Sequence, residues 1–205
     1  ISDVNTDLKG DTNMRFVAGT SWELDGLALP VGQGDERKYL ESGEVPGHVR
    51  IIDLSQDFRL SAESSTRSRQ FVYGLTELNY DTIRAAGNIA NPGCFATCIQ
   101  LGLLPLAAAG LLTDDVHISA ITGSTGAGQK PTASTHFSWR ANNLSVYKVF
   151  EHQHLNEIGE SIGSLMPGFA HEINFVPYRG DFTRGIMASI YTRCELSIEE
   201  AVAMY

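Results

Sequence analysis

A Pro-Gly turn lies at the centre of the stretch Ile89-Ala90-Asn91-Pro92-Gly93-Cys94-Phe95-Ala96-Thr97. Residues 88–90 before the turn have the pattern of a short buried strand. Residues 95–112 after it carry apolar side chains around the whole circumference of a predicted helix, which is typical of a helix buried on most sides. Cys94 is therefore predicted to open a buried helix directly after a strand.

Upstream of this turn, strand and helix patterns alternate. Residues 49–54 are short, β-branched and mostly apolar, as in a buried parallel strand, and they follow a helix-compatible stretch at 35–41. A second helix is predicted over 76–86, ending at Gly87 before the strand at 88–90. The brief apolar run 16–18 is a possible further strand. This alternation predicts the α/β class with a parallel sheet, of the Rossmann type.

Downstream of the turn the pattern changes to period-two alternation, at 116–121, 145–150 and 186–191, with one clear amphipathic helix carrying Ile158, Ile162 and Leu165. These strands predict a second, largely antiparallel sheet of the α+β class. We place the boundary at the Asn91 turn, giving domains 1–91 and 92–205. The capping-box pattern at Ser197 predicts a helix that begins only a few residues before the end of the sequence. The second domain is therefore predicted to be incomplete.

The composition is that of a globular protein. The chain has 205 residues, 42% hydrophobic and 19% charged, and 15 basic against 24 acidic residues give a net charge of −9. No window of about 18 uninterrupted apolar residues occurs, so no membrane span is predicted. The sequence has no cluster of basic residues, so no nucleic-acid partner is predicted. An odd count of three cysteines without a signal peptide favours a reducing, cytoplasmic location. The spacing of cysteine and histidine does not match a structural zinc site, and no metal is predicted.

Cys94 is the strongest single candidate for chemistry. At the start of a helix, unpaired backbone N–H groups and the helix dipole favour the thiolate, which is the nucleophilic form. The alternative is a buried cysteine that acts as a small hydrophobic residue. Cys98, one turn further along the apolar helix, is more typical of a structural position, and Cys194 has no evident partner.

Three further groups are candidates. His152 and His154 alternate where a predicted strand ends, so both imidazoles are expected to enter one pocket, and histidine titrates near neutrality. The loop 123–128, Gly-Ser-Thr-Gly-Ala-Gly, allows close approach of a flat ligand, although an ordinary glycine loop is the simpler interpretation. Candidate cations for an acidic substrate are Arg179, Arg184 and Lys148, each of which also fits a solvated surface position.

In this order the motifs closely resemble the family of N-acetyl-gamma-glutamyl-phosphate reductases, which belong to arginine biosynthesis. The segment 89–97 and the following Gly102-Leu103-Leu104-Pro105 are similar to the active-site signature of that family. Segments 51–60, 72–78, 123–128, 147–154 and 184–186 agree with it, so the resemblance covers most of the chain from about Leu29 onward. Cys98 stands where the family usually has Gly or Ala, and the loop 29–34 lacks a histidine that the family usually carries.

The resemblance implies NADPH-dependent reduction of N-acetyl-L-glutamyl 5-phosphate to the 5-semialdehyde and phosphate, through a thioester on Cys94. It implies that His154, or secondly His152, transfers the proton. It implies that Ser124, Gly126 and Ala127 lie near the nicotinamide of NADP, and that Arg184 and Lys148 bind substrate anions. It also implies a homo-oligomer, and a glycine-rich pyrophosphate loop upstream of Ile1, so 1–91 is expected to be a partial NADP-binding domain.

Three other hypotheses remain open from the sequence. An aspartate-semialdehyde dehydrogenase shares the two-domain plan and the thioester chemistry, but it has a different sequence around its cysteine. A non-catalytic chain that serves in subunit assembly would need no glycine-rich loop. A cysteine hydrolase would use Cys94 and His154 as nucleophile and base, with water in place of hydride.

Overall fold

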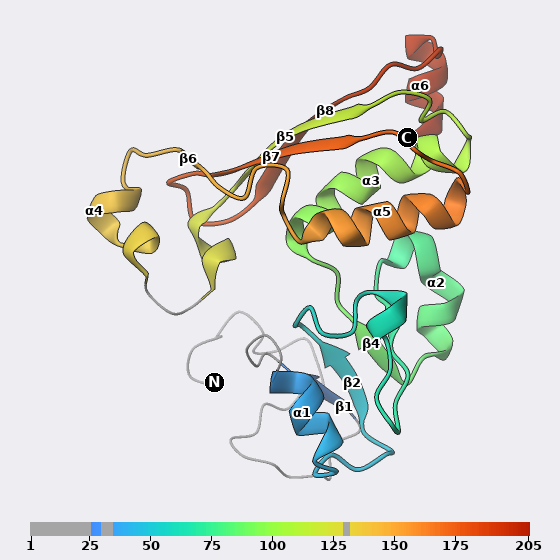
Figure 1. Ribbon diagram of the computed structural model, residues 1–205, viewed down its shortest axis with the longest axis vertical. Helices are drawn as coiled ribbons and strands as arrows, with labels where there is room; N and C mark the ends of the chain where they lie inside the picture. The colour runs from blue at the N-terminus through green and yellow to red at the C-terminus, as the bar shows by residue number, and fades with distance from the viewer. Residues whose placement is uncertain (1–25, 30–34, 129–131) are drawn as a thin grey trace, which may run out of the picture.

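The structure, a computed structural model, describes residues 26–29, 35–128 and 132–205 and contains two four-stranded sheets (Figure 1). The upper sheet in this view lies against the helices α3 (Cys94–Ala108) and α5 (His154–Leu165), and the lower sheet lies next to α1 (Asp35–Glu41). Each sheet has its own cluster of buried apolar side chains. The turn at Asn91 joins the last strand of the lower sheet to α3, so it lies at the junction of the two cores.

The first sheet is entirely parallel, with the strand order β1-β2-β4-β3. Its strands are β1 (Gly26–Leu29), β2 (Arg50–Asp53), β3 (Val72–Tyr73) and β4 (Asn88–Ala90). Helix α1 follows β1, the short 3₁₀ helix η2 (Ser61–Glu63) follows β2, and α2 (Thr76–Ala85) follows β3. The predicted parallel α/β arrangement is therefore confirmed. Because the carboxyl ends of these strands meet at one edge, the loops after β2, β3 and β4 leave the sheet together, beside the start of α3.

The second sheet is mixed, with the order β6-β7-β5-β8. Its strands are β5 (Val116–Thr122), β6 (Ser145–Val146), β7 (Ile173–Arg179) and β8 (Ile186–Tyr191). The β5–β8 and β6–β7 pairings are antiparallel, as expected, whereas β5 and β7 pair in parallel. Helices α3 and α5 cover one face. Smaller helices are η3 (Ser124–Ala127), η4 (Ala133–Thr135), α4 (Phe137–Arg140) and α6 (Ile198–Met204), of which α6 has the predicted capping box at Ser197.

Two details differ from the sequence prediction. The strand expected over 145–150 stops at Val146, because Lys148 and Phe150 take positive φ angles of 45° and 60°, which no strand allows. β7 has no counterpart among the strands expected from the alternation. The possible strand at 16–18 and most of the loop 29–34 lie outside the described residues. Among the described residues, none of the helices combines the length and the apolar character that crossing a bilayer requires.

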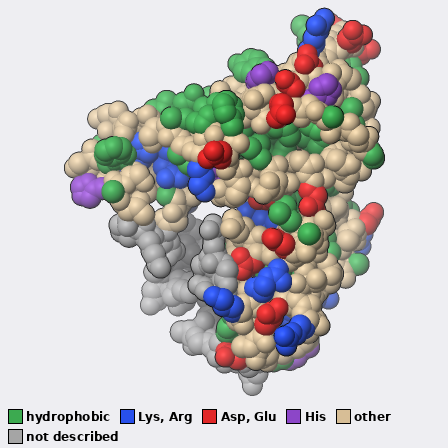
Figure 2. Space-filling view, viewed as in Figure 1, with side chains coloured by type: hydrophobic (Ala, Val, Ile, Leu, Met, Phe, Trp, Pro, Cys, Tyr) green, Lys and Arg blue, Asp and Glu red, His purple; other side chains and the backbone are tan. Residues whose placement is uncertain are grey.

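The far face of the second sheet carries exposed apolar side chains among the described residues, beside the polar His117, Ser119 and Ser189. Along β8, Ile186, Ala188 and Ile190 pack against the core, so Met187 and Tyr191 point away from it and are 62% and 66% exposed. Ile121 of β5 pairs with Met187 and shares this outer face. Figure 2 shows apolar side chains gathered over the upper sheet of the molecule. Patches of this kind mark interaction surfaces.

A buried arginine holds the first sheet to its loops. The guanidinium of Arg69, whose residue is only 8% exposed, donates from Nη1 to the Val49 carbonyl and Asn88 Oδ1, both at 2.9 Å. Its Nη2 donates to the carbonyls of Val45 and Pro46 at 3.2 and 2.6 Å. One side chain thus satisfies acceptors from the loop before β2 and from β4, and leaving such groups unpaired costs about 1–3 kcal/mol each.

We therefore expect Arg69→Met to lower the free energy of unfolding by at least about 3 kcal/mol, measured by urea unfolding. Arg67→Met, at an exposed position two residues earlier, is the matched control, expected within about 0.5 kcal/mol of the parent. Equal midpoints for the two variants would contradict this assignment.

Candidate active site

Cys94 is the first residue of α3 and is accessible on the surface. The turn before it is fixed by the Asn91 N–H, which donates to the Asp53 carbonyl at 2.8 Å, and Gly93 caps the helix with an extended backbone and no side chain. Immediately after Cys94, Phe95 and Ala96 are fully buried. The thiol therefore stands at a rigid point between the two sheets.

The helix terminus does not by itself keep this thiol ionised. Desolvation by the surrounding protein raises the pKa of the Cys94 thiol, and it outweighs the backbone N–H groups of Phe95 and Cys94 and the charge of Arg59, which lower it. The charge of Glu157 raises the pKa further. The expectation of a thiolate stabilised by the helix dipole is thus corrected: at rest, burial favours the neutral thiol, which needs a nearby base to become a nucleophile.

Two histidines lie close to the turn before Cys94. The rings of His152 and His154 lie 4.5 Å apart between centroids, and the backbone N–H of His154 donates to Nδ1 of His152 at 3.3 Å. His152 makes edge contacts with Tyr147 and Phe175, whereas a Cβ added at Gly93 would collide with Nε2 of His154. The imidazole of His154 thus lies against the backbone of the residue before Cys94.

Both histidines are neutral at pH 7. Burial lowers the pKa of His154 to about 4, helped by the charges of Arg59 and Lys148, and burial together with the charges of His154 and Lys148 lowers the pKa of His152 to about 4. Neutral imidazoles can accept a proton. The sequence placed both residues on an extended segment, but His154 begins α5. The two rings nevertheless lie side by side, because the helix start turns the second ring back toward the first.

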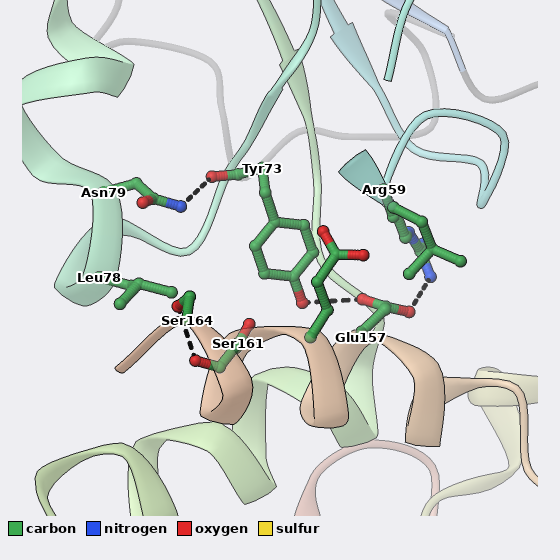
Figure 3. Close-up of a pocket in the computed structure, with 9 residues that line it drawn as sticks. Arg59, Tyr73, Leu78, Asn79, Glu157, Ser161 and Ser164 are labelled. Atoms are coloured by element: carbon green, nitrogen blue, oxygen red, sulfur yellow. Dashed lines mark hydrogen bonds and ion pairs between the residues drawn. The ribbon is translucent and has the colours of Figure 1, made fainter. Parts of the chain in front are cut away.

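Glu157, one turn along α5 from His154, connects the two sheets (Figure 3). Its carboxylate is 5% exposed, and Oε1 accepts from Nη1 of Arg59 at 3.0 Å. Its Oε2 accepts from the hydroxyl of Tyr73 and from the backbone N–H of Gly93, both at 2.9 Å. Figure 3 shows Arg59 and Tyr73 converging on Glu157 beside a pocket of about 180 Å³.

Two cations, Lys148 and Arg179, lie near the histidines and Tyr147. Lys148 donates from Nζ to Oε1 of Gln153 at 2.8 Å, next to the histidines. Arg179 stacks on the ring of Tyr147, with 4.5 Å from the guanidinium carbon to the ring centroid. Burial raises the pKa of Tyr147, Arg179 opposes that shift, and Cys94 adds to it, so all three groups lie within electrostatic range.

The glycine loop and Arg184 form a second group, at the carboxyl end of β5. Backbone N–H groups of Ser124 and Thr125 donate to the carbonyls of Phe182 and Thr183 at 2.8 and 3.2 Å, which seats the loop beside the segment that carries Arg184. A Cβ at Gly123 would lie 2.6 Å from the Thr183 carbonyl oxygen, so this glycine is required by the close approach of two backbones. Gly126 is exposed and presents bare backbone, and Ala127 ends the 3₁₀ turn.

The sequence reasoning missed Arg59, Tyr73 and Glu157. Arg59 and Tyr73 lie in segments 51–60 and 72–78, which carried the family resemblance, but the sequence alone gave them no role. The spacing of His154 and Glu157 at i, i+3 places both on one side of the first turn of α5 and was the available signal.

The chain is similar in sequence to known proteins. The family model described as semialdehyde dehydrogenase, dimerisation domain, matches residues 94–205. The chain is 50% identical over its whole length to an N-acetyl-gamma-glutamyl-phosphate reductase of Bacteroides thetaiotaomicron and 48% identical over 98% of its length to one of Christiangramia forsetii. It spans 63% and 62% of these relatives, respectively. The family resemblance stated from the sequence is thereby confirmed.

Solved structures show the same fold at low identity. Aspartate semialdehyde dehydrogenase II of Vibrio cholerae superposes with a TM-score of 0.65 at 15% identity, covering 90% of this chain and 61% of that one. The enzyme of Candida albicans, solved with NADP, gives a TM-score of 0.58 at 10% identity, covering 91% and 56%. With a family model that covers more than half of its residues, the chain belongs to the semialdehyde dehydrogenase family.

Proposed function

We propose that this chain carries the catalytic cysteine of an NADPH-dependent reductase that converts N-acetyl-L-glutamyl 5-phosphate to N-acetyl-L-glutamate 5-semialdehyde and phosphate. The observation that carries the proposal is the position of Cys94 at the start of α3, directly after Gly93, against whose backbone the neutral imidazole of His154 lies. The relatives at about 50% identity bear the name of this activity. We assign residues 1–91 to the cofactor-binding part and 92–205 to the catalytic and oligomerisation part, a division supported by the two separate cores.

In the first half-reaction the Cys94 thiol gives its proton to His154 and attacks the acyl carbonyl, which expels phosphate and leaves a thioester. The substrate is anionic, so its approach favours the charged form of His154 that burial disfavours in the resting protein. Arg59 and Lys148 stabilise the departing phosphate electrostatically. The backbone N–H of His154 donates to Nδ1 of His152, which holds the His152 ring beside the second histidine.

The second half-reaction needs NADPH, which supplies the hydride when bound. The exposed backbone of Gly126, flanked by Ser124 and Ala127, fits the approach of a planar ring, and this is the feature of the described residues that suits the cofactor. Reduction of the thioester gives a thiohemiacetal on Cys94, and its collapse releases the aldehyde while the sulfur recovers a proton from His154. We propose that Arg184, in the segment whose backbone bonds to the same loop, binds a carboxylate of the substrate.

Substrate choice separates this proposal from its nearest rival. Phosphate-dependent reduction of NADP should be faster with N-acetyl-L-glutamate 5-semialdehyde than with aspartate semialdehyde. Preference for aspartate semialdehyde would favour the enzyme class of the solved structures. Hydrolysis of the acyl phosphate without NADPH as the main reaction would favour the cysteine hydrolase, and no turnover at all would favour a role in assembly only.

Cys94→Ser should reduce reductase activity of the full-length protein by at least about 10³-fold, because the thioester cannot form. Cys98→Ala, one turn further along α3, is the matched control and should keep activity within about twofold of the parent. Initial rates with saturating NADP and phosphate provide the measurement. Comparable activity of the two variants would remove Cys94 from the mechanism.

The histidines also predict an acid dependence of stability. An unfolded histidine binds a proton near pH 6.5, whereas the folded pKa of His154 is about 4. Between these values the unfolded chain holds more protons, so stability is present above pH 6.5 and is lost as the pH falls toward 4.

The loss between pH 7 and pH 5 should be on the order of 1–2 kcal/mol for His154, and His154→Asn should abolish that part of it. His48→Asn, at an exposed position, should keep the parent's pH dependence. Thermal unfolding at both pH values checks this. A slope in His154→Asn as steep as in the parent would refute a neutral buried imidazole.

We propose that the apolar part of the outer face of the second sheet, formed by Ile121, Met187 and Tyr191, is the contact between two copies of the chain, in a reducing cytoplasmic setting. The printed description of the family model, a dimerisation domain, supports this choice of partner. The apolar character of the face favours self-association over contact with an acidic or basic partner.

Met187→Asp should therefore convert the full-length protein to a smaller species, because a charge would be buried at the contact. Tyr80→Asp, on α2 and 57% exposed, introduces the same charge at an exposed apolar position away from this face and should leave assembly intact. Sedimentation velocity distinguishes the two, and unchanged assembly in Met187→Asp would exclude this face.

A further inference from the structure

The Glu157 carboxylate accepts three hydrogen bonds from segments that are far apart in the sequence. Arg59 comes from the loop after β2, Tyr73 from the end of β3 and the Gly93 N–H from the turn after β4. All three leave the same edge of the first sheet, whereas Glu157 belongs to α5 under the second sheet. A single buried carboxylate therefore fixes the edge of one sheet to a helix of the other.

The contact with Gly93 has the most direct consequence for chemistry. Gly93 is the residue before Cys94 and has no side chain, and the ring of His154 lies where its Cβ would be. Glu157 and His154 stand at i, i+3 in the first turn of α5, with 3.9 Å between Oε1 and Nε2, so the carboxylate bonds the Gly93 N–H while the imidazole packs against the same residue. The first turn of α5 thus contacts the backbone of Gly93, the residue that precedes Cys94.

The same carboxylate acts on the thiol through its charge. Among the charged and titratable groups that act on Cys94, Glu157 raises the pKa of the thiol and Arg59 lowers it. Cys98 on α3 and Tyr147 before α5 are the other titratable groups within range. Because Arg59 and Glu157 are paired at 3.0 Å, their opposite effects on Cys94 largely cancel as long as the pair is intact.

Tyr73 links Glu157 to helix α3 through its hydroxyl group. Its hydroxyl donates to Glu157 and accepts from Nε2 of the buried Gln100 on α3 at 2.7 Å. Burial, and secondly the charge of Glu157, raises the pKa of this phenol well above its ordinary value, so it remains a hydrogen-bond donor throughout the working range of pH.

We propose that Glu157 is a positioning residue of the reductase: its carboxylate holds the Gly93 turn, and hence the Cys94 sulfur, in place against the first sheet, and balances the charge of Arg59 beside it. This inference rests on the proposed role of Cys94 as nucleophile. The alternative is that the Arg59–Glu157 ion pair contributes only to stability. In that case its loss would lower the free energy of unfolding without a change in the ionisation of the thiol.

Glu157→Gln separates these roles in the full-length protein, since the amide keeps the volume and one acceptor oxygen but removes the charge. Arg59 is then unbalanced, so the pH midpoint for alkylation of Cys94 by iodoacetamide should fall by about half a unit or more. Turnover should fall roughly 10- to 100-fold with KM within about twofold, since a small misplacement of the sulfur affects the chemical step. Peptide mapping separates labelling at Cys94 from labelling at Cys98.

Three companion variants keep the test decisive. Arg59→Gln leaves Glu157 unbalanced and should move the alkylation midpoint upward, opposite to Glu157→Gln. Glu157→Asp keeps the charge but shortens the reach, so it should lower turnover with little change in the midpoint. Glu160→Gln is the matched control, because Glu160 lies on the same helix and accepts from the Ser61 N–H at 2.8 Å without touching the Gly93 turn. It should retain both the midpoint and the turnover.

Alkylation requires no substrate, so it tests the inference independently of the proposed reaction. An alkylation midpoint in Glu157→Gln equal to that of the parent, in a protein with reductase activity, would overturn the inference, as would an equal loss of turnover in Glu160→Gln. Absence of reductase activity in the parent would instead refute the proposed function. If Glu157→Gln fails to fold, an unchanged midpoint in Arg59→Gln overturns the inference.

Discussion

The buried carboxylate of Glu157 is the constraint on which the geometry of the site depends. Its bonds to Arg59, Tyr73 and the Gly93 N–H join three loops of the parallel sheet to the helix that carries His154. Helices α3 and α5, which carry the thiol and the imidazole, share one apolar core, and Glu157 adds a polar contact between this pair of helices and the loops of the first sheet. A buried charge is expensive unless it is paired and hydrogen-bonded, and here both conditions are met.

The state of the thiol follows from a competition between burial and local charge. A helix start offers N–H groups that stabilise a thiolate, but desolvation at Cys94 is the stronger effect and keeps the resting thiol neutral. The neighbouring histidines are held neutral for the same reason. Near these neutral groups lie Lys148, which is hydrogen-bonded to Gln153, and Arg179, which is stacked on Tyr147, while Arg59 is paired with Glu157. In the reaction that we propose, the charge of an anionic substrate offsets the desolvation that opposes proton transfer from sulfur to nitrogen.

Much of this architecture could be predicted from local sequence. The Pro-Gly turn placed Cys94 at the start of an apolar helix, and the alternation before it gave the parallel sheet, because both signals depend on neighbouring residues. The early end of β6 could not be predicted, since the period-two pattern of residues 145–150 gives no signal of the positive φ angles of Lys148 and Phe150. Nor could the role of Glu157, whose partner Arg59 lies 98 residues away in the chain. A contact between segments so far apart in the chain produces no periodic pattern in the local sequence from which it could be predicted.

The central claim is that the Cys94 sulfur becomes acylated. The most direct measurement mixes the full-length protein with N-acetyl-L-glutamyl 5-phosphate in the absence of NADPH, quenches in acid and maps the adduct by peptide mass spectrometry. The account predicts an N-acetylglutamyl thioester on Cys94 that hydroxylamine removes. An adduct on Cys98 or Cys194, or no adduct in a protein that turns over with NADPH present, would contradict it.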